Sequence, residues 1–289
     1  MTAASIPGFF SAQIAEASRF HLDLNPPADV PLAVVSGGRE NCAADYEIHR
    51  LGFPFWGLEF VARGSGSFRI GEEVFEILPG SVFSYGPDTG HDILTNGTDL
   101  LVKYFVDFTG SRAAGLLASH GLNPGRVIQT SVPGEVAAIF DDLIRNGLKC
   151  TPLSGRITAA ILQHLLLKLE ETAMPNGASG SPAFATYHRC REHIQSHWAA
   201  LDSLAQIASD CHLDATYLCR LFRRFDRQSP YQLLLRLKIN HAAERLRGEQ
   251  VAVAQVAEEL RFADPFHFSR VFKKFIGISP SHFIRRSGR

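Results

Sequence analysis

One basic, aromatic helix pattern occurs twice in the C-terminal third of the chain, fifty residues apart. The stretch DATYLCRLFRRFDRQSP begins at Asp214, and DPFHFSRVFKKFIGISP begins at Asp264. The residues that coincide are Asp214 and Asp264, Arg220 and Arg270, Phe222 and Phe272, Phe225 and Phe275, Ser229 and Ser279, and Pro230 and Pro280. Such a repeat predicts two copies of one supersecondary unit.

The first copy predicts a short helix, a turn and a second helix. Ser203 and Gln206 form a capping box for the short helix, and Asp214 is the expected N-cap of the second. The apolar side of the second helix has the spacing i, i+3, i+4, i+7 and comprises Leu218, Leu221, Phe222 and Phe225. The opposite, outward side comprises Thr216, Cys219, Arg220, Arg223 and Arg224.

The second copy follows the same plan. Asp264 is the expected N-cap and Pro265 occupies the first helical position, where its missing N–H costs nothing. The inward residues are Phe268, Val271, Phe272 and Phe275. The outward residues are His267, Ser269, Arg270, Lys273 and Lys274. In both copies Ser-Pro then starts the next helix.

The charge distribution indicates which partner these outward faces meet. Residues 1–183 contain 12 basic and 19 acidic residues, whereas residues 184–289 contain 17 and 10. An α-helix fits the major groove of DNA, where arginine reads guanine and neighbouring cations hold phosphates. A bridging helix of about 18 residues spans roughly 27 Å, so the two copies could enter successive grooves. One copy alone would be equally consistent with a solvated basic face, but two matched copies favour double-stranded DNA.

Residues 186–286 resemble the DNA-binding domain of the AraC/XylS family of bacterial transcription factors. The stretch that carries the resemblance is AEELRFADPFHFSRVFKKFIGISPSHFIR. It departs from the family pattern at Arg261, where the family usually has a turn glycine, and at Phe266 and His267, where it often has Ser-Tyr. The resemblance implies two sets of base-facing positions, Thr216, Cys219 and Arg220 in the first helix and Phe266, His267, Ser269 and Arg270 in the second.

The rest of the chain predicts a two-domain α+β protein. Short apolar runs separated by turn residues predict strands from about 30 to 110, as in a β-sandwich or barrel, and period 3.6 predicts helices at 133–148 and 155–171. The resemblance implies that residues 1–172 form a cupin-like sensor barrel with dimerisation helices. Residues 173–183 are rich in Gly, Ser and Pro and are expected to be a flexible linker. Residues 184–289 are expected to form seven helices with helix-turn-helix motifs at about 203–225 and 253–275.

The helix at 155–171 is apolar over more than one face, so it is either buried in its own domain or packed against a second subunit. We expect a homodimer. The candidate contact residues are Ile161, Leu165 and Leu169.

A small sugar-like, polar or anionic effector is expected inside the barrel. Arg50, His91 and Lys103 are the candidate polar contacts, and Trp56, Tyr104 and Phe105 are candidate walls. Each of them could instead be an ordinary core or surface residue. The alternative function is a cupin-type enzyme or metal-binding protein fused to a nucleic-acid-binding domain. It lacks support, because the chain has no HxH ligand pair and no catalytic signature, so we expect neither metal, cofactor nor enzymatic activity.

The cellular setting follows from what the sequence lacks. The five cysteines form no CxxC pair, no signal peptide is recognisable, and no apolar run reaches the roughly 18 residues that span a bilayer. We expect a bacterial cytoplasmic protein, held at the nucleoid by DNA and not bound to membrane. The sequence does not decide between repressor and activator; an activator would also contact RNA polymerase.

Overall fold

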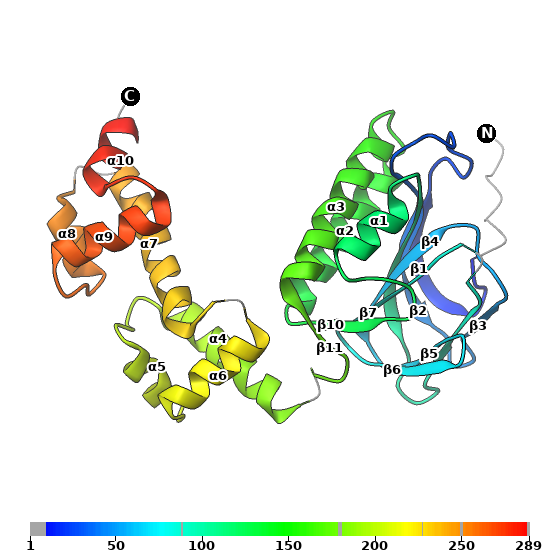
Figure 1. Cartoon of the computed structure of the whole chain (residues 1–289), viewed down its shortest axis with the longest axis horizontal. Helices are drawn as coiled ribbons and strands as arrows, with labels where there is room; N and C mark the ends of the chain where they lie inside the picture. The colour runs from blue at the N-terminus through cyan, green and yellow to red at the C-terminus, as the bar shows by residue number, and fades with distance from the viewer. Residues whose placement is uncertain (1–9, 88, 179–180, 227, 249–250, 288–289) are drawn as a thin grey trace. The chain divides into compact units, whose positions relative to one another are not determined.

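The computed structural model describes residues 10–87, 89–178, 181–226, 228–248 and 251–287. The chain divides into two compact units, residues 1–180 and 181–289, which are called the N-terminal and C-terminal units below. Figure 1 shows strands and helices in the first unit and helices alone in the second. Within the described residues, no helix combines the length and apolarity needed to cross a membrane.

The N-terminal unit contains two antiparallel sheets. The larger has the strand order β1-β2-β9-β4-β7-β10-β11 and the smaller the order β3-β8-β5-β6. The strands are β1 (Ile14–His21), β2 (Ala33–Cys42), β3 (Glu47–Arg50), β4 (Trp56–Arg63), β5 (Gly66–Ile70), β6 (Glu73–Ile77), β7 (Ser81–Tyr85), β8 (His91–Thr95), β9 (Val102–Thr109), β10 (Val127–Thr130) and β11 (Ala173–Pro175). This is the β-rich domain that the sequence predicts.

The larger sheet has two buried faces. Three helices cover one of them: α1 (Ala113–Ser119), α2 (Pro133–Leu148) and α3 (Ser154–Thr172). On that face Leu58 and Phe60 of β4 pack in one cluster with Phe140 of α2. The smaller sheet covers the other face, where Val61 of β4 packs in one cluster with Phe68 of β5. Successive residues of a strand alternate between the faces, so β4 and β9 send every second side chain into the space between the sheets.

The structure corrects several predicted boundaries. Strands β1, β10 and β11 lie outside the predicted interval of 30–110, and α1 was not predicted. β11 also occupies the first three residues of the expected 173–183 linker. It pairs with β10, and Met174 is buried. Because a strand paired on a sheet is held by backbone hydrogen bonds, the part of this segment free to act as a linker is shorter than the sequence predicts.

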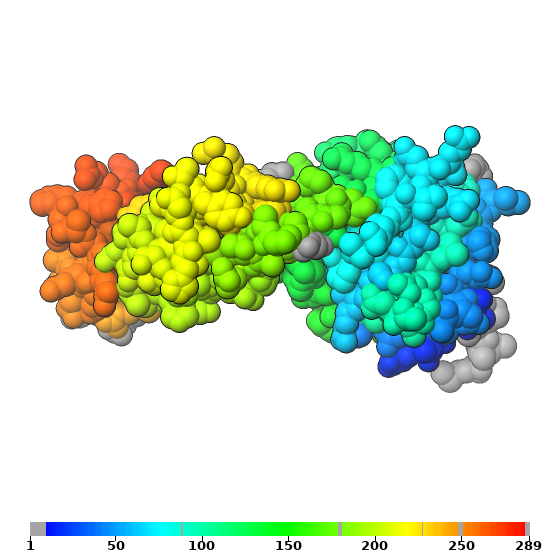
Figure 2. All heavy atoms as spheres, turned by 90° about the horizontal axis from the view of Figure 1, so that it is seen from below, coloured from blue at the N-terminus to red at the C-terminus, as the bar shows by residue number. Residues whose placement is uncertain are grey.

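The C-terminal unit forms seven helices within its described residues, as predicted: α4 (Pro182–His197), α5 (Leu204–Asp210), α6 (Ala215–Phe225), α7 (Pro230–Gly248), α8 (Val253–Glu259), α9 (Pro265–Ile276) and α10 (Pro280–Ser287). α5 with α6, and α8 with α9, are the two helix-turn-helix motifs. They lie at the two ends of α7 (Figure 1), and the space-filling view colours the first yellow-green to yellow and the second orange to red (Figure 2).

The candidate dimer residues prove to be core residues. Leu165 and Leu169 of α3 are fully buried against α2 and the larger sheet, and Ile161 is partly buried there. These side chains face their own domain, so they are not available to a second subunit. The opposite side of α3 carries exposed apolar residues instead: Ile157, Ala160 and Leu167. The helix is apolar on two sides, and the sequence did not show which side faces inward.

Candidate nucleic-acid interface and effector pocket

The second helix of each motif begins at an aspartate N-cap. The Asp214 carboxylate accepts hydrogen bonds from the N–H groups of Thr216 (2.8 Å) and Tyr217 (3.1 Å), and Asp264 accepts one from His267 N–H (2.7 Å). The backbone N–H groups at the start of α6 hold the pKa of Asp214 below its usual value. The caps predicted from sequence are therefore present, and each fixes where its helix starts.

The turn before each of these helices contains one residue in the left-handed region. His212 has φ +57° and Arg261 has φ +56°, and each lies two positions after the end of its short helix. Left-handed backbone strains a residue that carries a Cβ, which explains why glycine is usual at the position of Arg261. Here the Arg261 side chain makes a compensating contact, because its Nη1 donates to the carbonyl of Ala200 at 3.1 Å. This bond joins the turn of the second motif to the loop that precedes the first.

A second bond holds the same turn to α7. The Lys238 ammonium is buried and donates to the carbonyl of Leu260 at 2.5 Å. Burial lowers the pKa of Lys238, with nearby Asp202 opposing that effect and Arg261 adding to it. The second motif is thus tied both to the connecting helix and to the loop before the first motif, which restrains the angle between the two.

The structure sorts the predicted DNA-contacting residues by accessibility. Most are exposed: Thr216, Arg220, Arg223, Arg224, Phe266, Arg270, Lys273 and Lys274. Three are half-buried: Cys219, His267 and Ser269. On the opposite side of each helix, Leu218 with Phe222 and Phe268 with Phe272 are buried. Both helices therefore present a basic face outward from an apolar anchor.

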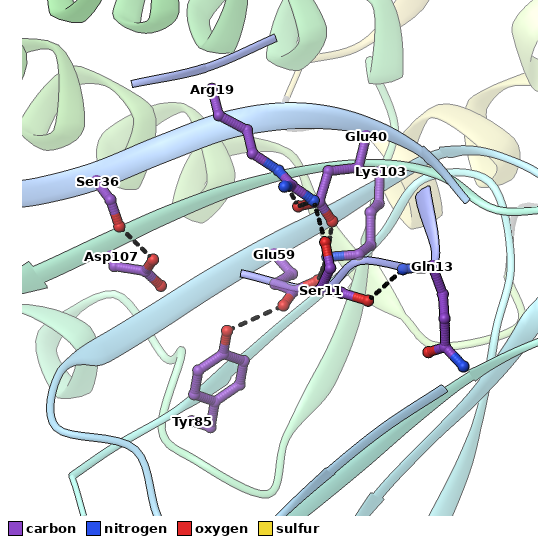
Figure 3. A network of polar contacts seen from close by, with 9 residues as sticks. All are labelled: Ser11, Gln13, Arg19, Ser36, Glu40, Glu59, Tyr85, Lys103 and Asp107. Carbon is purple, nitrogen blue, oxygen red and sulfur yellow. Dashed lines mark hydrogen bonds and ion pairs between the residues drawn. The ribbon is translucent and has the colours of Figure 1, made fainter. Parts of the chain in front are cut away.

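A network of buried charges lies between the sheets of the N-terminal unit (Figure 3). The Lys103 ammonium is 2.9 Å from a carboxylate oxygen of Glu40 and 2.9 Å from one of Glu59. Arg19 pairs with Glu40 at 2.7 Å, and the Tyr85 hydroxyl donates to Glu59 at 2.9 Å. The Tyr85 ring lies against Gly57, where a Cβ atom would come within 2.1 Å of it.

Burial and ion pairing shift the pKa values of Lys103 and Glu40 in opposite directions. Burial alone would lower the pKa of Lys103, but Glu40 and Glu59 raise it well above its usual value. Burial alone would raise the pKa of Glu40, yet Lys103 and Arg19 hold it below its usual value. These groups therefore stay charged, and each neutralises its neighbours.

Burial shifts the pKa values of Asp107 and His91 toward the neutral form of each group, because neither has an ion-pair partner among the described residues. Burial raises the pKa of Asp107 to about 7, although the Ser36 hydroxyl donates to its carboxylate at 2.5 Å. Burial lowers the pKa of His91, whose ring stacks on Tyr85 at 3.9 Å between centroids. Since His91 Nδ1 is 3.1 Å from the Thr89 carbonyl, that nitrogen carries the proton and Nε2 is left as an acceptor.

The predicted effector residues do not all lie between the two sheets. Lys103 and Phe105 lie between the sheets, where the Lys103 ammonium is 5.3 Å from the centre of the Phe105 ring. Arg50 is half-buried at the end of β3 and lies over the Phe53 ring, beside an open hollow of about 410 Å³. Trp56 packs against the helix-covered face. As a pocket wall Trp56 is therefore misassigned, because it has the same strand parity as Leu58 and Phe60. Tyr104 is misassigned for the same reason, since its ring packs against Phe140 of α2 at 5.4 Å between centroids.

Sequence reasoning missed the acidic half of this network. Glu59 and Asp107 each interrupt an apolar strand, in FWGLEFV and LLVKYFVDF. Lys103, Phe105 and Asp107 alternate along one strand and so share a face. The sequence signal for Asp107 was its spacing from Lys103: the two residues lie four positions apart in one apolar strand, so their side chains face the same way.

Two further features bear on what the unit can bind. Among the described residues, no three His, Cys, Asp or Glu side chains are grouped so that they could hold a metal ion. A groove of about 680 Å³ lies outside the sheets, between the segment of residues 21–34 and the first half of α3. This groove is larger than the hollow beside Arg50, whereas the sequence predicted a ligand site inside the barrel.

Comparison with known families matches both units. The family model described as "AraC-like ligand binding domain" matches residues 34–169, and the model described as "Helix-turn-helix domain" matches residues 207–286. The first match covers most of both sheets and α1 to α3. The second runs from within α5 into α10, and so includes part of the first motif and all of the second.

Relatives of similar length carry related names. The Msm operon regulatory protein of Streptococcus mutans is 22% identical over 267 residues, which cover 87% of this chain and 92% of that protein. The MmsAB operon regulatory protein of Pseudomonas aeruginosa is 22% identical over 270 residues, covering 90% and 85%. The solved C-terminal domain of AraT from Geobacillus stearothermophilus is 28% identical, covers 37% of this chain and 86% of that one, and has a TM-score of 0.33. The chain belongs to the AraC/XylS family and is a DNA-binding transcriptional regulator with an AraC-like ligand-binding domain.

Proposed function

We propose that α6 and α9 read bases in successive major grooves of one DNA duplex. The observation that supports this most directly is the matched exposure of Arg220 and Arg270, each on the outward face of a helix capped by aspartate. α7 has 19 residues and is therefore about 28 Å long. Major grooves on one face of the duplex repeat every 34–36 Å or so, so helices at the two ends of α7 suit neighbouring grooves.

We infer that the effector is a small, neutral molecule rich in hydroxyl groups. The charges between the sheets are already balanced, because Lys103 and Arg19 face Glu40 and Glu59. An added carboxylate or ammonium would need a counter-charge in this buried place, and an unpaired charge there is costly. This argues against the anionic alternative and for a sugar-like ligand.

Three buried polar atoms that find no hydrogen-bond partner in the described part of the chain support this ligand class: Tyr46 Oη, His91 Nε2 and Asp107 Oδ1. Each of these residues lies within electrostatic range of Glu59. Tyr46 can donate, His91 Nε2 can accept, and Asp107 can do either according to pH. A hydroxyl group both donates and accepts, so it complements this set. Glu40 and Glu59 are engaged by Lys103 and Tyr85, which favours a binding role over catalysis.

We propose that two copies associate through the exposed side of α3. Its accessible apolar residues recur at coiled-coil spacing: Leu153, Ile157, Ala160 and Leu167, with His164 between the last two. Ala160 also lines the 680 Å³ groove, so the partner's helix would meet a hollowed surface beside this row. The dimer would act in the cytoplasm, and as an activator it would also contact RNA polymerase.

Replacing Arg270 by alanine is expected to lower specific DNA affinity by about 1–3 kcal/mol while leaving binding to random duplexes nearly unchanged. Lys273→Ala is the matched control, because a phosphate contact weakens both kinds of binding alike and reduces the salt dependence by about one ion. Fluorescence anisotropy with a selected duplex and a random duplex measures both. Equal losses on the two duplexes for Arg270→Ala would remove its base-reading role.

The effector proposal predicts that neutral sugars or polyols, and not the corresponding sugar acids, raise the thermal unfolding midpoint of the full chain. Tyr46→Phe should weaken the active compound about 2- to 12-fold, since one hydrogen bond contributes roughly 0.5–1.5 kcal/mol. Calorimetric titration of both proteins measures the change. A response confined to the sugar acids, or a full response without the Tyr46 hydroxyl, would contradict the assignment.

Asp107 is expected to make stability depend on pH. Its folded-state pKa of about 7 exceeds the ordinary value of 3.8, so the folded chain binds more protons and loses stability as pH rises from about 4 to about 7. The loss is of the order of 4 kcal/mol, because each pKa unit corresponds to about 1.4 kcal/mol. Asp107→Asn should remove this part of the pH profile in denaturant unfolding, whereas Glu73→Gln on the surface should not. A variant whose profile parallels the wild type would refute the buried-acid assignment.

The dimer proposal predicts different outcomes for two leucines two residues apart. Leu167 is 58% exposed and Leu165 is fully buried. Leu167→Asp should therefore give a folded monomer, whereas Leu165→Asp should unfold the N-terminal unit by burying an unpaired charge. Light scattering gives the mass and circular dichroism reports the fold. A Leu167→Asp protein that remains dimeric would exclude this side of α3 as the interface.

A further inference from the structure

Phe266 is exposed in a way that the packing of its own unit does not explain. It is the second residue of α9, and its side chain is 82% exposed. Among the described residues from 181 onward, it is the one large apolar side chain that the fold leaves mostly in solvent. Phe268 and Phe272 of the same helix are fully buried, so the core on that side is already filled. An exposed phenyl ring on a basic surface suggests a partner with an apolar group.

The position of Phe266 on α9 indicates where that partner lies. Arg270 follows at i+4 and Lys273 at i+7, and both are exposed. Residues at this spacing share one face of a helix. Phe266 therefore forms the N-terminal end of the same outward face that carries the guanidinium and ammonium groups. The N-terminal residues of a recognition helix are the ones that meet base edges.

We propose that Phe266 contacts the C5-methyl group of a thymine in the major groove, which makes it a specificity-determining residue. The inference rests on the proposed function of α9 as a recognition helix. A phenyl ring cannot hydrogen-bond to base edges or pair with phosphates, and the thymine methyl is the apolar group that the major groove presents. From Phe266 to Arg270 the helix rises about 6 Å, or roughly two base pairs. The half-site of α9 thus combines this thymine with a guanine about two base pairs away.

Helix α6 has the same arrangement with a smaller apolar group. Thr216 occupies the position of Phe266 at the fifty-residue offset, it is exposed, and Arg220 follows at i+4. The threonine methyl is another side-chain group that contacts thymine methyl in the major groove. Each motif therefore places an apolar group one helical turn before an arginine. The contact of Thr216 is the smaller of the two.

The neighbours of Phe266 hold the start of α9 in place. Asp264 caps the helix through His267 N–H, and the His267 ring packs edge-on against Phe262 at 5.6 Å between centroids. Phe262 in turn packs edge-on against the buried Phe268 at 5.2 Å. The backbone that carries Phe266 is thus fixed before DNA arrives, which lowers the ordering cost of the contact.

The test removes one methyl group at a time. The full-length protein first selects its highest-affinity duplex from a random library. Each thymine of that duplex is then replaced singly by deoxyuridine, which lacks only the C5-methyl group. For the wild type, one replacement in the α9 half-site should raise Kd about fourfold, the effect of one buried methyl group. With Phe266→Ala the same replacement should have no effect, whereas Phe266→Leu should retain part of it.

Thr216→Ser provides the matched test in the α6 half-site, because it deletes a single methyl group from the protein. Arg270→Ala serves as the reference for the proposed function. If Arg270→Ala loses specific binding but no thymine in the α9 half-site responds to deoxyuridine, the methyl contact is wrong while α9 remains a recognition helix. The methyl contact is equally wrong if Phe266→Ala keeps the wild-type response. If Arg270→Ala also binds specific and random DNA like the wild type, the recognition role of α9 itself fails.

Discussion

The N-terminal unit is organised around one buried cation. Lys103 lies on the interior strand β9 of the larger sheet and is paired with Glu40 of β2 and Glu59 of β4, which are the two strands beside it. Removing either carboxylate would leave the buried network with one positive charge in excess, and that is more costly than losing a surface ion pair. Strands β2, β9 and β4 are therefore coupled by side chains as well as by backbone hydrogen bonds. This coupling sets the polar character of the interior that we propose as the ligand site.

The C-terminal unit depends on a different constraint, the geometry of its two turns. Each motif needs one left-handed residue between its helices, and the chain supplies His212 and Arg261 rather than glycine. At Arg261 the backbone strain coincides with a hydrogen bond to Ala200, which lies 61 residues away in the sequence. Glycine would relieve the strain but would remove the bond. The residue that departs from the family pattern is thus one that restrains the first motif relative to the second.

The helical half of the fold could be predicted closely from sequence because its signals are local. Caps such as Asp214 and Asp264, the Ser-Pro starts and the period of the apolar residues all act within one or two turns. The sheets depend on pairing between distant residues, so β1, β10 and β11 carried no comparable local signal. Sequence also could not decide which face a side chain occupies where both faces of an element are apolar, and this explains the errors at Trp56, Leu165 and Leu169.

The route by which a ligand could influence the C-terminal unit is shorter than a free linker would suggest. Tyr85 lies on β7, and its hydroxyl donates a hydrogen bond to Glu59. Strand β7 pairs with β10, and β10 pairs with β11. β11 follows α3 directly, and Thr172 at the end of α3 bonds Thr130 of β10 at 2.8 Å. Just beyond β11, the Asn176 side chain donates to the carbonyl of Glu76 on β6.

The segment leading to the DNA-binding helices is therefore attached to the sheet that holds the polar network, and to the helix that carries the proposed dimer surface. A ligand that favours one arrangement of Tyr85 and Glu59 need differ in affinity by only about 1.4 kcal/mol between two states to change their balance tenfold. Because α3 and β11 are continuous in the chain, a shift of this edge of the sheet would change the dimer surface and the start of the connecting segment together. In the proposed dimer, a ligand bound at the proposed site would therefore act by changing the spacing between the two DNA-binding units.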